Sequence, residues 1–452
     1  MAEEGERVTK TLQRKIIADA LESGFEEAEV YYQETEGFEV LIMEGEVSNF
    51  ENSQEAGISF RGRYHGKMGY AHTEKLVEES IPYLLETAKE NAEILSLAEE
   101  EGIYSGDAYG LWNGYVPSLE EMGIEERIDM AKRMERAALS STGNVAQLDY
   151  CMLGMHKVTI GITNSAGLHV VYTKNGAMGY VSAIARKNGE TKTGDFFWKG
   201  QDWRTFNPEE TGQTAAKRAA ALLGASSVPS GVYSVILDGR AMTALLSAFS
   251  SVFFAESVQK GFSLLAGKSG ERIGAGCVTI RDDGLLERGY ASVPFDSEGV
   301  GAKNKVVVED GVLKTLLYNR KTAKVDGVES TGNGFKGGLT APIKTACTNF
   351  YITAGKQTRA QLLEQMGDGL YITGLMGLHA GVNVVSGDFS LSAEGFLVEE
   401  ERLTHGVEQI TIAGNFYQLL MDIRGITDDV FFAQSGKGSP DVWVKALSVA
   451  GE

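Results

Sequence analysis

The order of helix-like and strand-like segments constrains the fold of this chain more than any other feature of the sequence. Apolar residues at helical spacing predict an opening helix from Val8 to Ser23, and short alternating strands follow from Glu29 to about His72. A second amphipathic helix is expected from Glu74 to Ala92. Strands therefore come in runs rather than alternating with helices, which argues against a doubly wound parallel sheet and favours the α+β class.

Helices and groups of strands follow one another in the same way up to the middle of the chain. The stretch Glu99–Pro117 has no period, so we expect a long loop with aromatic anchors. Helices are expected from Ser118 to about Leu139 and from Glu209 to Leu223, with several short strands from Val145 to Trp198 between them. The pattern predicts an N-terminal α/β-sandwich-like domain with a mixed sheet.

A domain boundary is expected at Gly224–Gly231, a stretch of small residues that contains a proline. It divides the chain into an N-terminal α+β domain, residues 1–225, and a β-rich C-terminal domain, residues 226–452. The second half opens with a strand at Tyr233–Leu237 and a helix at Arg240–Ser257, and then becomes mostly strand. Glu309-Asp310-Gly311 between two apolar runs predicts a hairpin turn.

Glycine supports a strand-rich reading. The chain has 55 glycines but only seven prolines among 452 residues, against a typical glycine content of ~7%. Without a repeat period, this composition predicts many tight turns and bulges between strands rather than a flexible linker.

Charge excludes some classes of partner. The formal net charge is -20, and no cluster of lysine and arginine is dense enough to neutralise a phosphate backbone; even Arg61-Gly62-Arg63 has only Lys67 nearby. We therefore expect no nucleic acid and no membrane as a main partner.

The charged N-terminus lacks an apolar signal core, and the three cysteines lie far apart, as in a reducing compartment. The expected location is cytoplasmic.

Two glycine motifs fall short of nucleotide sites. Gly332-Asn-Gly-Phe-Lys-Gly337 matches G-x-G-x-x-G, but Pro342 follows where the dinucleotide fold needs a helix. The segment from Gly261 to Gly267 before Lys268-Ser269 has five residues between the glycines, where a Walker loop has four. The first motif remains a candidate for a loop whose backbone an extended ligand can approach closely.

Metal and nucleophile centres are not complete in the sequence. None of the six histidines lies four or five residues from another, so no helix presents a zinc-protease pair. No G-x-S-x-G elbow occurs, and Cys347 has no histidine near it in sequence. The acid pairs Asp282-Asp283 and Asp428-Asp429 are expected to be solvated turns. The sequence therefore predicts no catalytic residue, no metal ligand and no cofactor, and leaves open only a site assembled by the fold.

Several segments, in order and at matching spacing, carry a resemblance to a known family. In the first half they are Glu44-Gly-Glu46, Gly57-Ile-Ser-Phe-Arg61 and Gly66-Lys-Met-Gly69. In the second half they are Thr279-Ile-Arg-Asp-Asp-Gly284, Phe295-Asp-Ser-Glu-Gly299, Ser330-Thr-Gly-Asn333, Thr348-Asn-Phe-Tyr-Ile-Thr-Ala-Gly355, Ser386-Gly-Asp-Phe-Ser390 with Glu394-Gly-Phe396, and Thr411-Ile-Ala-Gly-Asn415. Together they resemble the TldD/PmbA family, once named for modulation of DNA gyrase.

The resemblance implies one of two family types. TldD-type members resemble metalloproteases, with His-Glu-x-x-x-His on the helix early in the second domain and a later cysteine completing a zinc site. Here that helix runs from Ala241 to Glu256 without a histidine, and no cysteine follows Cys347. The chain thus resembles the PmbA (also TldE) type that lacks the zinc motif. The family then implies a TldD-type catalytic subunit as partner and unfolded peptides as substrate.

Peptide contacts are expected in two glycine-rich loops. Strand-rich walls and exposed glycine backbone suit the capture of an extended peptide through main-chain hydrogen bonds. The residues expected to take part are Gly332, Asn333, Gly334, Gly377, His379 and Asn383. The alternative for both loops is that they are tight turns between strands.

Three functions remain open at this point. The favoured one is a non-catalytic, peptide-binding subunit of a TldD-type cytosolic protease, and a homodimer of this chain is also conceivable because a face made for a homologue can pair with itself. The second is a self-sufficient peptidase with a non-zinc centre, such as Cys347 or scattered carboxylates. The third is a regulatory module that binds gyrase or another protein.

Overall fold

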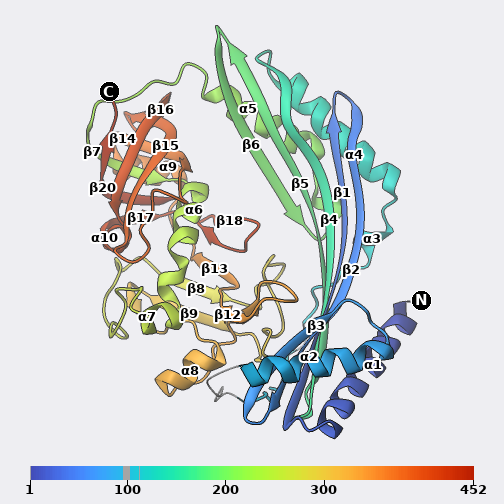
Figure 1. Cartoon of the computed structure of the whole chain (residues 1–452). Coiled ribbons are helices and arrows are strands. Elements are labelled where there is room, and N and C mark those ends of the chain that lie inside the picture. Colours follow the sequence, from blue (N-terminus) through green and yellow to red (C-terminus); the bar gives the residue numbers. More distant parts are fainter. Residues whose placement is uncertain (1, 95–101, 111) are drawn as a thin grey trace.

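The computed structural model describes residues 2–94, 102–110 and 112–452. The chain is a strand-rich α+β protein, as predicted (Figure 1). The loop expected at Glu99–Pro117 has neither helix nor strand in its described residues before the turn at Pro117; Glu99–Glu101 and Leu111 lie outside the described residues. No helix in the described ranges combines the length and hydropathy needed to cross a bilayer.

Six strands of the first half form one sheet in the order β3-β2-β1-β4-β5-β6. Their bounds are β1 Glu27–Met43, β2 Glu46–Tyr64, β3 Lys67–Thr73, β4 Val145–Asn164, β5 His169–Lys187 and β6 Glu190–Gly200. All five pairings are antiparallel, so the sheet is not mixed as the sequence led us to expect. Short turns join the chain neighbours in this sheet, and a short turn permits only antiparallel pairing.

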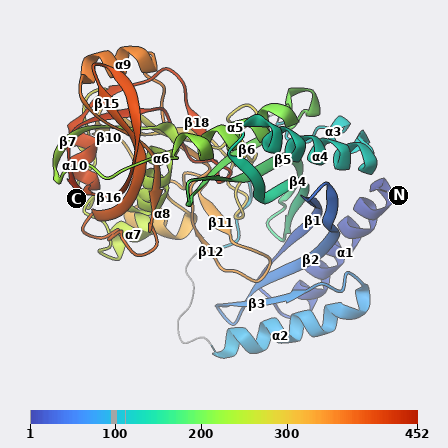
Figure 2. The ribbon, with the colours of Figure 1, turned by 90° about the horizontal axis from the view of Figure 1, so that it is seen from above.

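Helices cover one face of this sheet. They are α1 Ala2–Glu22, α2 Ile81–Ile94, the short α3 Ser118–Glu121, α4 Ile124–Ser141 and α5 Pro208–Ala221, with 3-10 turns at Glu78–Ser80 and Trp203–Thr205. Along β1, Val30 packs in the core with α1 and α2, and Val40 packs in the core with α4 and α5. Because side chains alternate along a strand, the odd-numbered residues Glu29 and Tyr31 point to the opposite face. The C-terminal half lies on that side of the sheet (Figures 1 and 2).

The C-terminal half is built on two further sheets and a small hairpin. One sheet has the order β10-β9-β8-β13-β19-β18 and the other β16-β15-β14-β7-β20-β17, with β16 also paired to β20. Five strands, β16, β15, β14, β7 and β20, therefore close into a ring, which leaves no open edge among them. The strand bounds are β7 Gly231–Leu237, β8 Ile280–Asp283, β9 Asn304–Glu309, β10 Val312–Leu313, β11 Gly334–Lys336, β12 Ile343–Thr345, β13 Asn349–Ile352, β14 Gly369–Met376, β15 Asp388–Glu399, β16 Arg402–Asn415, β17 Ile423–Ile426, β18 Phe431–Phe432, β19 Gly438–Ser439 and β20 Val442–Ala450.

The helix expected at Arg240–Ser257 is broken. The chain forms α6 Gly239–Phe249, a 3-10 turn Ser250–Phe253 and α7 Ala255–Gln259. Phe254 interrupts the helix because its backbone is extended and forms an isolated bridge with Leu317. The remaining helices are α8 Arg320–Asp326, α9 Arg359–Met366 and α10 Phe416–Asp422. The core surrounds α6, where Phe249 stacks on Phe416 with ring centroids 4.5 Å apart.

The predicted hairpin at Glu309-Asp310-Gly311 is confirmed as the β9–β10 turn. Asp310 and Gly311 both have positive φ, 47° and 79°. A Cβ on Gly311 would lie 2.1 Å from the carbonyl oxygen of Gly274. Glycine is therefore required here by both its backbone angle and its surroundings.

Candidate functional site

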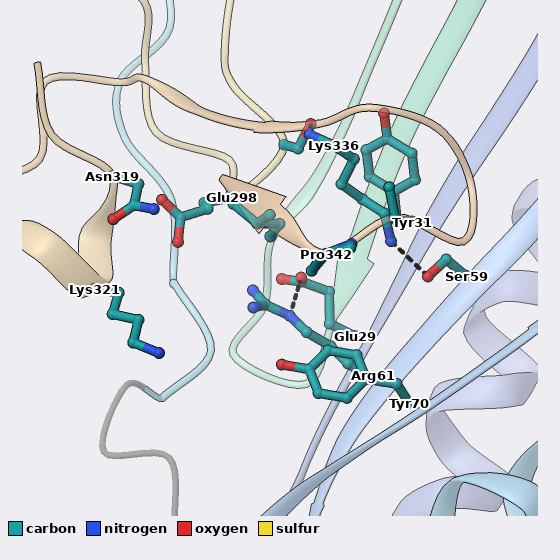
Figure 3. A pocket seen from close by; sticks show the side chains of 13 residues that line it. Glu29, Tyr31, Ser59, Arg61, Tyr70, Glu298, Asn319, Lys321, Lys336 and Pro342 are labelled. Atoms are coloured by element: carbon teal, nitrogen blue, oxygen red, sulfur yellow. Dashed lines mark hydrogen bonds and ion pairs between the residues drawn. The ribbon is translucent and has the colours of Figure 1, made fainter. Parts of the chain in front are cut away.

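A cavity of about 170 Å³ lies where the first sheet meets the C-terminal half (Figure 3). The strands β1, β2 and β3 form one wall, and the β11–β12 hairpin, the loop before β9 and the start of α8 form the other. The lining residues are Glu29, Tyr31, Ser59, Arg61, Tyr70, Ser297, Glu298, Asn319, Lys321, Lys336, Ala341, Pro342 and Ile343. Segments far apart in the sequence thus meet around one small space.

Strand register places the sheet side of the cavity. Tyr31 of β1 lies opposite Ser59 of β2, and Glu29 lies opposite Arg61. Arg61 in turn lies opposite Tyr70 of β3. Side chains directly opposite each other share one face of a sheet. All five therefore stand on the face that the helices leave uncovered.

Arg61 and Glu29 form the charged centre of this wall. Arg61 Nε donates to Glu29 Oε1 at 2.7 Å, and Glu29, only 2% exposed, also accepts from Asn164 Nδ2 at 3.0 Å. Burial opposes the charge of Arg61, but the Glu29 carboxylate outweighs it, so the pKa of Arg61 is raised above its usual value. The Nη2 atom of Arg61 is buried, and no group in the described residues accepts a hydrogen bond from it.

Lys336 brings a second cation from the hairpin. Its Nζ donates to Ser59 Oγ at 2.7 Å and lies 5.1 Å from the centroid of the Tyr31 ring. Burial, together with the charge of Arg61, lowers the pKa of Lys336 to about 8. Burial raises the pKa of Tyr31 to about 12. Lys336 therefore titrates close to neutral pH, whereas Tyr31 stays protonated there.

The loop between Phe295 and Gly299 fixes the opposite wall. Asp296 Oδ1 accepts from the backbone N–H groups of Glu298 and Val300, at 2.9 and 3.0 Å, and its Oδ2 accepts from Gly334 N at 2.8 Å. Glu298 Oε2 accepts from the N–H of Arg320 at 2.8 Å, at the start of α8. Burial raises the pKa of both carboxyl groups, that of Asp296 to about 8. These acids tie the hairpin and α8 to the wall.

The structure separates the predicted peptide-binding residues into two groups. Gly332, Asn333 and Gly334 lie at the start of the β11–β12 hairpin, next to the cavity wall. Asn333 is fully buried and donates from Nδ2 to Asp282 Oδ2 at 2.7 Å and to the carbonyl of Ala346 at 2.8 Å. Its side chain therefore holds the loop in place and is not exposed to a ligand. A backbone role for this loop in peptide binding stays a prediction.

The second group lies in the connection between β14 and β15. Gly377, His379 and Asn383 are all exposed. Asn383 Oδ1 accepts from the N–H groups of Val385 and Ser386, each at 3.1 Å, so this residue builds a turn. The side chain of His379 is exposed to solvent, and its part in peptide binding stays a prediction.

The residues present do not fit a catalytic metal. The helix α6 carries no histidine, cysteine or acidic residue between Gly239 and Phe249. In the described part of the chain, no group of three or more histidine, cysteine, aspartate or glutamate side chains is arranged to hold a metal ion. Helix α6 therefore offers no nitrogen, sulfur or carboxylate donor of the kind that binds zinc.

Cysteine chemistry also finds no support. Burial raises the pKa of Cys347 to about 11 and that of Cys151 to about 12. A reactive cysteine needs a lowered thiol pKa, because the thiolate is the nucleophile. Both thiols stay protonated at neutral pH, which weakens the alternative of a Cys347 peptidase.

Family models match most of the chain. They are the first, central and C-terminal domains of the PmbA/TldA metallopeptidases, over residues 28–92, 117–223 and 230–451. A crystal structure of a candidate modulator of a DNA gyrase from Thermotoga maritima is 34% identical, superposes with a TM-score of 0.90, and the match covers 98% of this chain and all of that one. The chain belongs to the PmbA/TldD metallopeptidase family.

Other relatives agree with this placement. The metalloprotease PmbA of Escherichia coli O157:H7 is 27% identical over 431 residues, which is 92% of each chain. The fold is also that of TldE from Thermococcus kodakarensis, with a TM-score of 0.90 at 22% identity over 97% of this chain. In this PmbA/TldD chain, therefore, the family's fold occurs with no cluster of metal-binding side chains among the described residues.

Sequence reasoning missed most of the cavity. Arg61 entered the sequence analysis in a basic cluster and in a family segment, without a binding role, and Lys336, Glu29 and Tyr31 were not singled out. Strand alternation around Glu29 and Arg61 was the available signal, since a charged residue at a regular sheet position needs a partner on the same face. No local signal links Lys336 to Ser59, because the fold alone brings them together.

Proposed function

We propose that this chain is a non-catalytic, peptide-binding subunit of the PmbA/TldE type, which acts with a TldD-type metalloprotease on unfolded peptides in the cytoplasm. The observation that carries the proposal is α6. Relatives that share the fold are named metalloproteases, yet the corresponding helix here offers only apolar and hydroxyl side chains besides Arg240. A chain that has the family's fold but no metal-binding side chains on this helix suits a role in binding peptide and in assembling with a catalytic subunit.

The alternative of a self-sufficient peptidase has one geometric argument in its favour. Lys336 Nζ lies 2.7 Å from Ser59 Oγ, and serine–lysine pairs serve as nucleophile and base in some hydrolases. Such a site also needs N–H donors that stabilise an oxyanion. Ser59 lies inside β2, paired with Tyr31 on one side and His72 on the other, so the N–H groups around it are used by the sheet. The pair lacks this part of a hydrolytic centre.

The proposal is tested by reconstitution. The pure chain, a TldD-type homologue from the same organism, and their mixture are assayed with an unfolded peptide substrate. We expect cleavage to appear or rise strongly only in the mixture, together with a complex of both chains on size-exclusion chromatography. Equal cleavage by the TldD-type chain with and without this protein would contradict the proposal.

A further inference from the structure

We propose that the cavity between β1–β3 and the β11–β12 hairpin binds a carboxylate group, with Arg61 and Lys336 as its cationic ligands. The inference rests on the proposed function only in taking a peptide C-terminus as the expected source of that carboxylate. The binding site itself follows from the geometry of this chain.

The guanidinium of Arg61 contains a hydrogen-bond donor without an acceptor. Arg61 lines the cavity, and its Nη2 atom is buried without a hydrogen-bond acceptor among the described residues. A buried donor without a partner is costly, and more so when it belongs to a charged group. Among the described residues that line the cavity, Arg61 is the one with such an orphaned side-chain atom. A ligand oxygen would satisfy it.

Lys336 places a second cation on the same cavity. Its ammonium group carries three N–H donors, of which one is used by Ser59 Oγ. Lys336 and Arg61 line the same cavity. Burial, and after it the charge of Arg61, lowers the pKa of Lys336. Glu29 is already the counter-ion of Arg61, whereas the ammonium of Lys336 bonds to a neutral hydroxyl, and a ligand carboxylate would give it a close counter-ion.

The charge balance selects a monoanion. Among the described residues that line the cavity, three are basic, Arg61, Lys321 and Lys336, and two are acidic, Glu29 and Glu298, which is one basic side chain in excess. Glu29 is engaged by Arg61 and Asn164, and Glu298 by the N–H of Arg320. One carboxylate would balance this excess, whereas a phosphate dianion would overshoot it.

Size and access favour a terminal group. A volume of about 170 Å³ is below the ~300 Å³ at which sites for drug-sized ligands begin. Glu29, Tyr31, Ser59 and Glu298 on the floor are each under 9% exposed, whereas Tyr70, Lys321 and Pro342 at the rim are exposed. A chain end can therefore enter from the rim while the rest of a peptide stays outside.

The test compares three ligands on the isolated full-length chain by titration calorimetry: an unstructured tripeptide with a free C-terminal carboxylate, the same tripeptide as its C-terminal amide, and N-acetylglycine as a small acid. We expect the free acid to bind at least about tenfold more tightly than the amide, a difference of ~1.4 kcal/mol. Tight binding of the acid tripeptide alone would assign the peptide terminus as the source, and equal binding of N-acetylglycine would assign a free small acid. Equal affinity of acid and amide would overturn the carboxylate site.

Variants locate the binding. Lys336→Met is expected to weaken binding of the acid at least about tenfold, and Lys336→Arg to restore it, because Arg supplies a permanent charge at the same place. Lys344→Met on the paired strand β12 is the matched control, since Lys344 is exposed and does not line the cavity. Unchanged affinity in a folded Lys336→Met protein would overturn the assignment. If this chain binds the carboxylate but does not change peptide cleavage by a TldD-type partner, the carboxylate site is supported and the proposed function is contradicted.

Discussion

Arg61 and Glu29 face each other across β2 and β1, with Nε and Oε1 2.7 Å apart and Glu29 almost fully buried. Breaking such a pair leaves the surviving charge buried without its counter-ion, which typically costs about 3–5 kcal/mol. We therefore expect Glu29→Gln to lower the free energy of unfolding by about 3 kcal/mol, measured by urea denaturation.

The control for that variant is an exposed pair. Glu46, whose side chain is 86% exposed, lies 3.6 Å from Lys132, and Glu46→Gln should change stability by less than about 0.5 kcal/mol. The double variant Glu29→Gln with Arg61→Met should recover part of the loss, because both charges are then removed. A single Glu29→Gln protein as stable as the parent would show that the pair is not buried as described.

Gly334 is predicted to be intolerant of a side chain. A Cβ there would lie 2.2 Å from Glu298 Oε2, so Gly334→Ala must push a buried carboxylate that holds α8. We expect a loss of about 1–3 kcal/mol in the free energy of unfolding. Gly338→Ala in the same loop is the control, because no atom lies within 4 Å of a Cβ at that position. Equal stability of the two variants would contradict this packing.

The two groups of predicted peptide contacts should behave differently. Asn333→Leu removes a fully buried amide that bonds to Asp282 and Ala346, and we expect it to destabilise the protein by about 2 kcal/mol or more. His379→Ala changes an exposed side chain and should alter stability by less than about 0.5 kcal/mol. If His379 contacts peptide, its variant weakens peptide binding at unchanged stability; unchanged binding would remove it from the site.

The binding of carboxylate ligands should depend on pH through Lys336. The pKa of Lys336 is lowered to about 8, so its ammonium is charged below pH 8 and lost above it. Affinity for the acid tripeptide should therefore fall as the pH rises through 8. It should fall less in Lys336→Arg, where the ionisation of Asp296, whose pKa is also raised to about 8, remains. The groups around Lys336 are Tyr31, Ser59, Arg61 and Glu29. Tyr31, with a pKa raised to about 12, and Arg61, with a raised pKa, keep their protons in this window. A parent profile that matches Lys336→Arg would contradict this assignment.

Local patterns in the sequence predicted local structure well. The turn at Asp310-Gly311 and the strand-rich α+β character follow from residue types and spacing alone. The helix at Arg240–Ser257 was expected to be continuous because its apolar spacing is helical throughout, but a long-range bridge from Phe254 to Leu317 interrupts it. The sheet of the first half was expected to be mixed, although the two-residue gaps between several strands already required antiparallel pairing.

The candidate site was less accessible to sequence reasoning. The lack of metal ligands on α6 could be read directly, because a zinc helix needs its histidines at fixed spacing. The cavity, in contrast, joins Ser59 and Lys336, which are 277 residues apart. Only the packing of the hairpin onto the open face of the first sheet brings them together, and no residue spacing encodes that contact.

The proposed function requires that this chain has no catalytic metal centre of its own. The most direct measurement is the zinc content of the purified chain by elemental analysis, together with its peptidase activity before and after treatment with a chelator. We expect far less than one zinc per chain and no chelator-sensitive cleavage. One zinc per chain with peptidase activity that the chelator abolishes would contradict it.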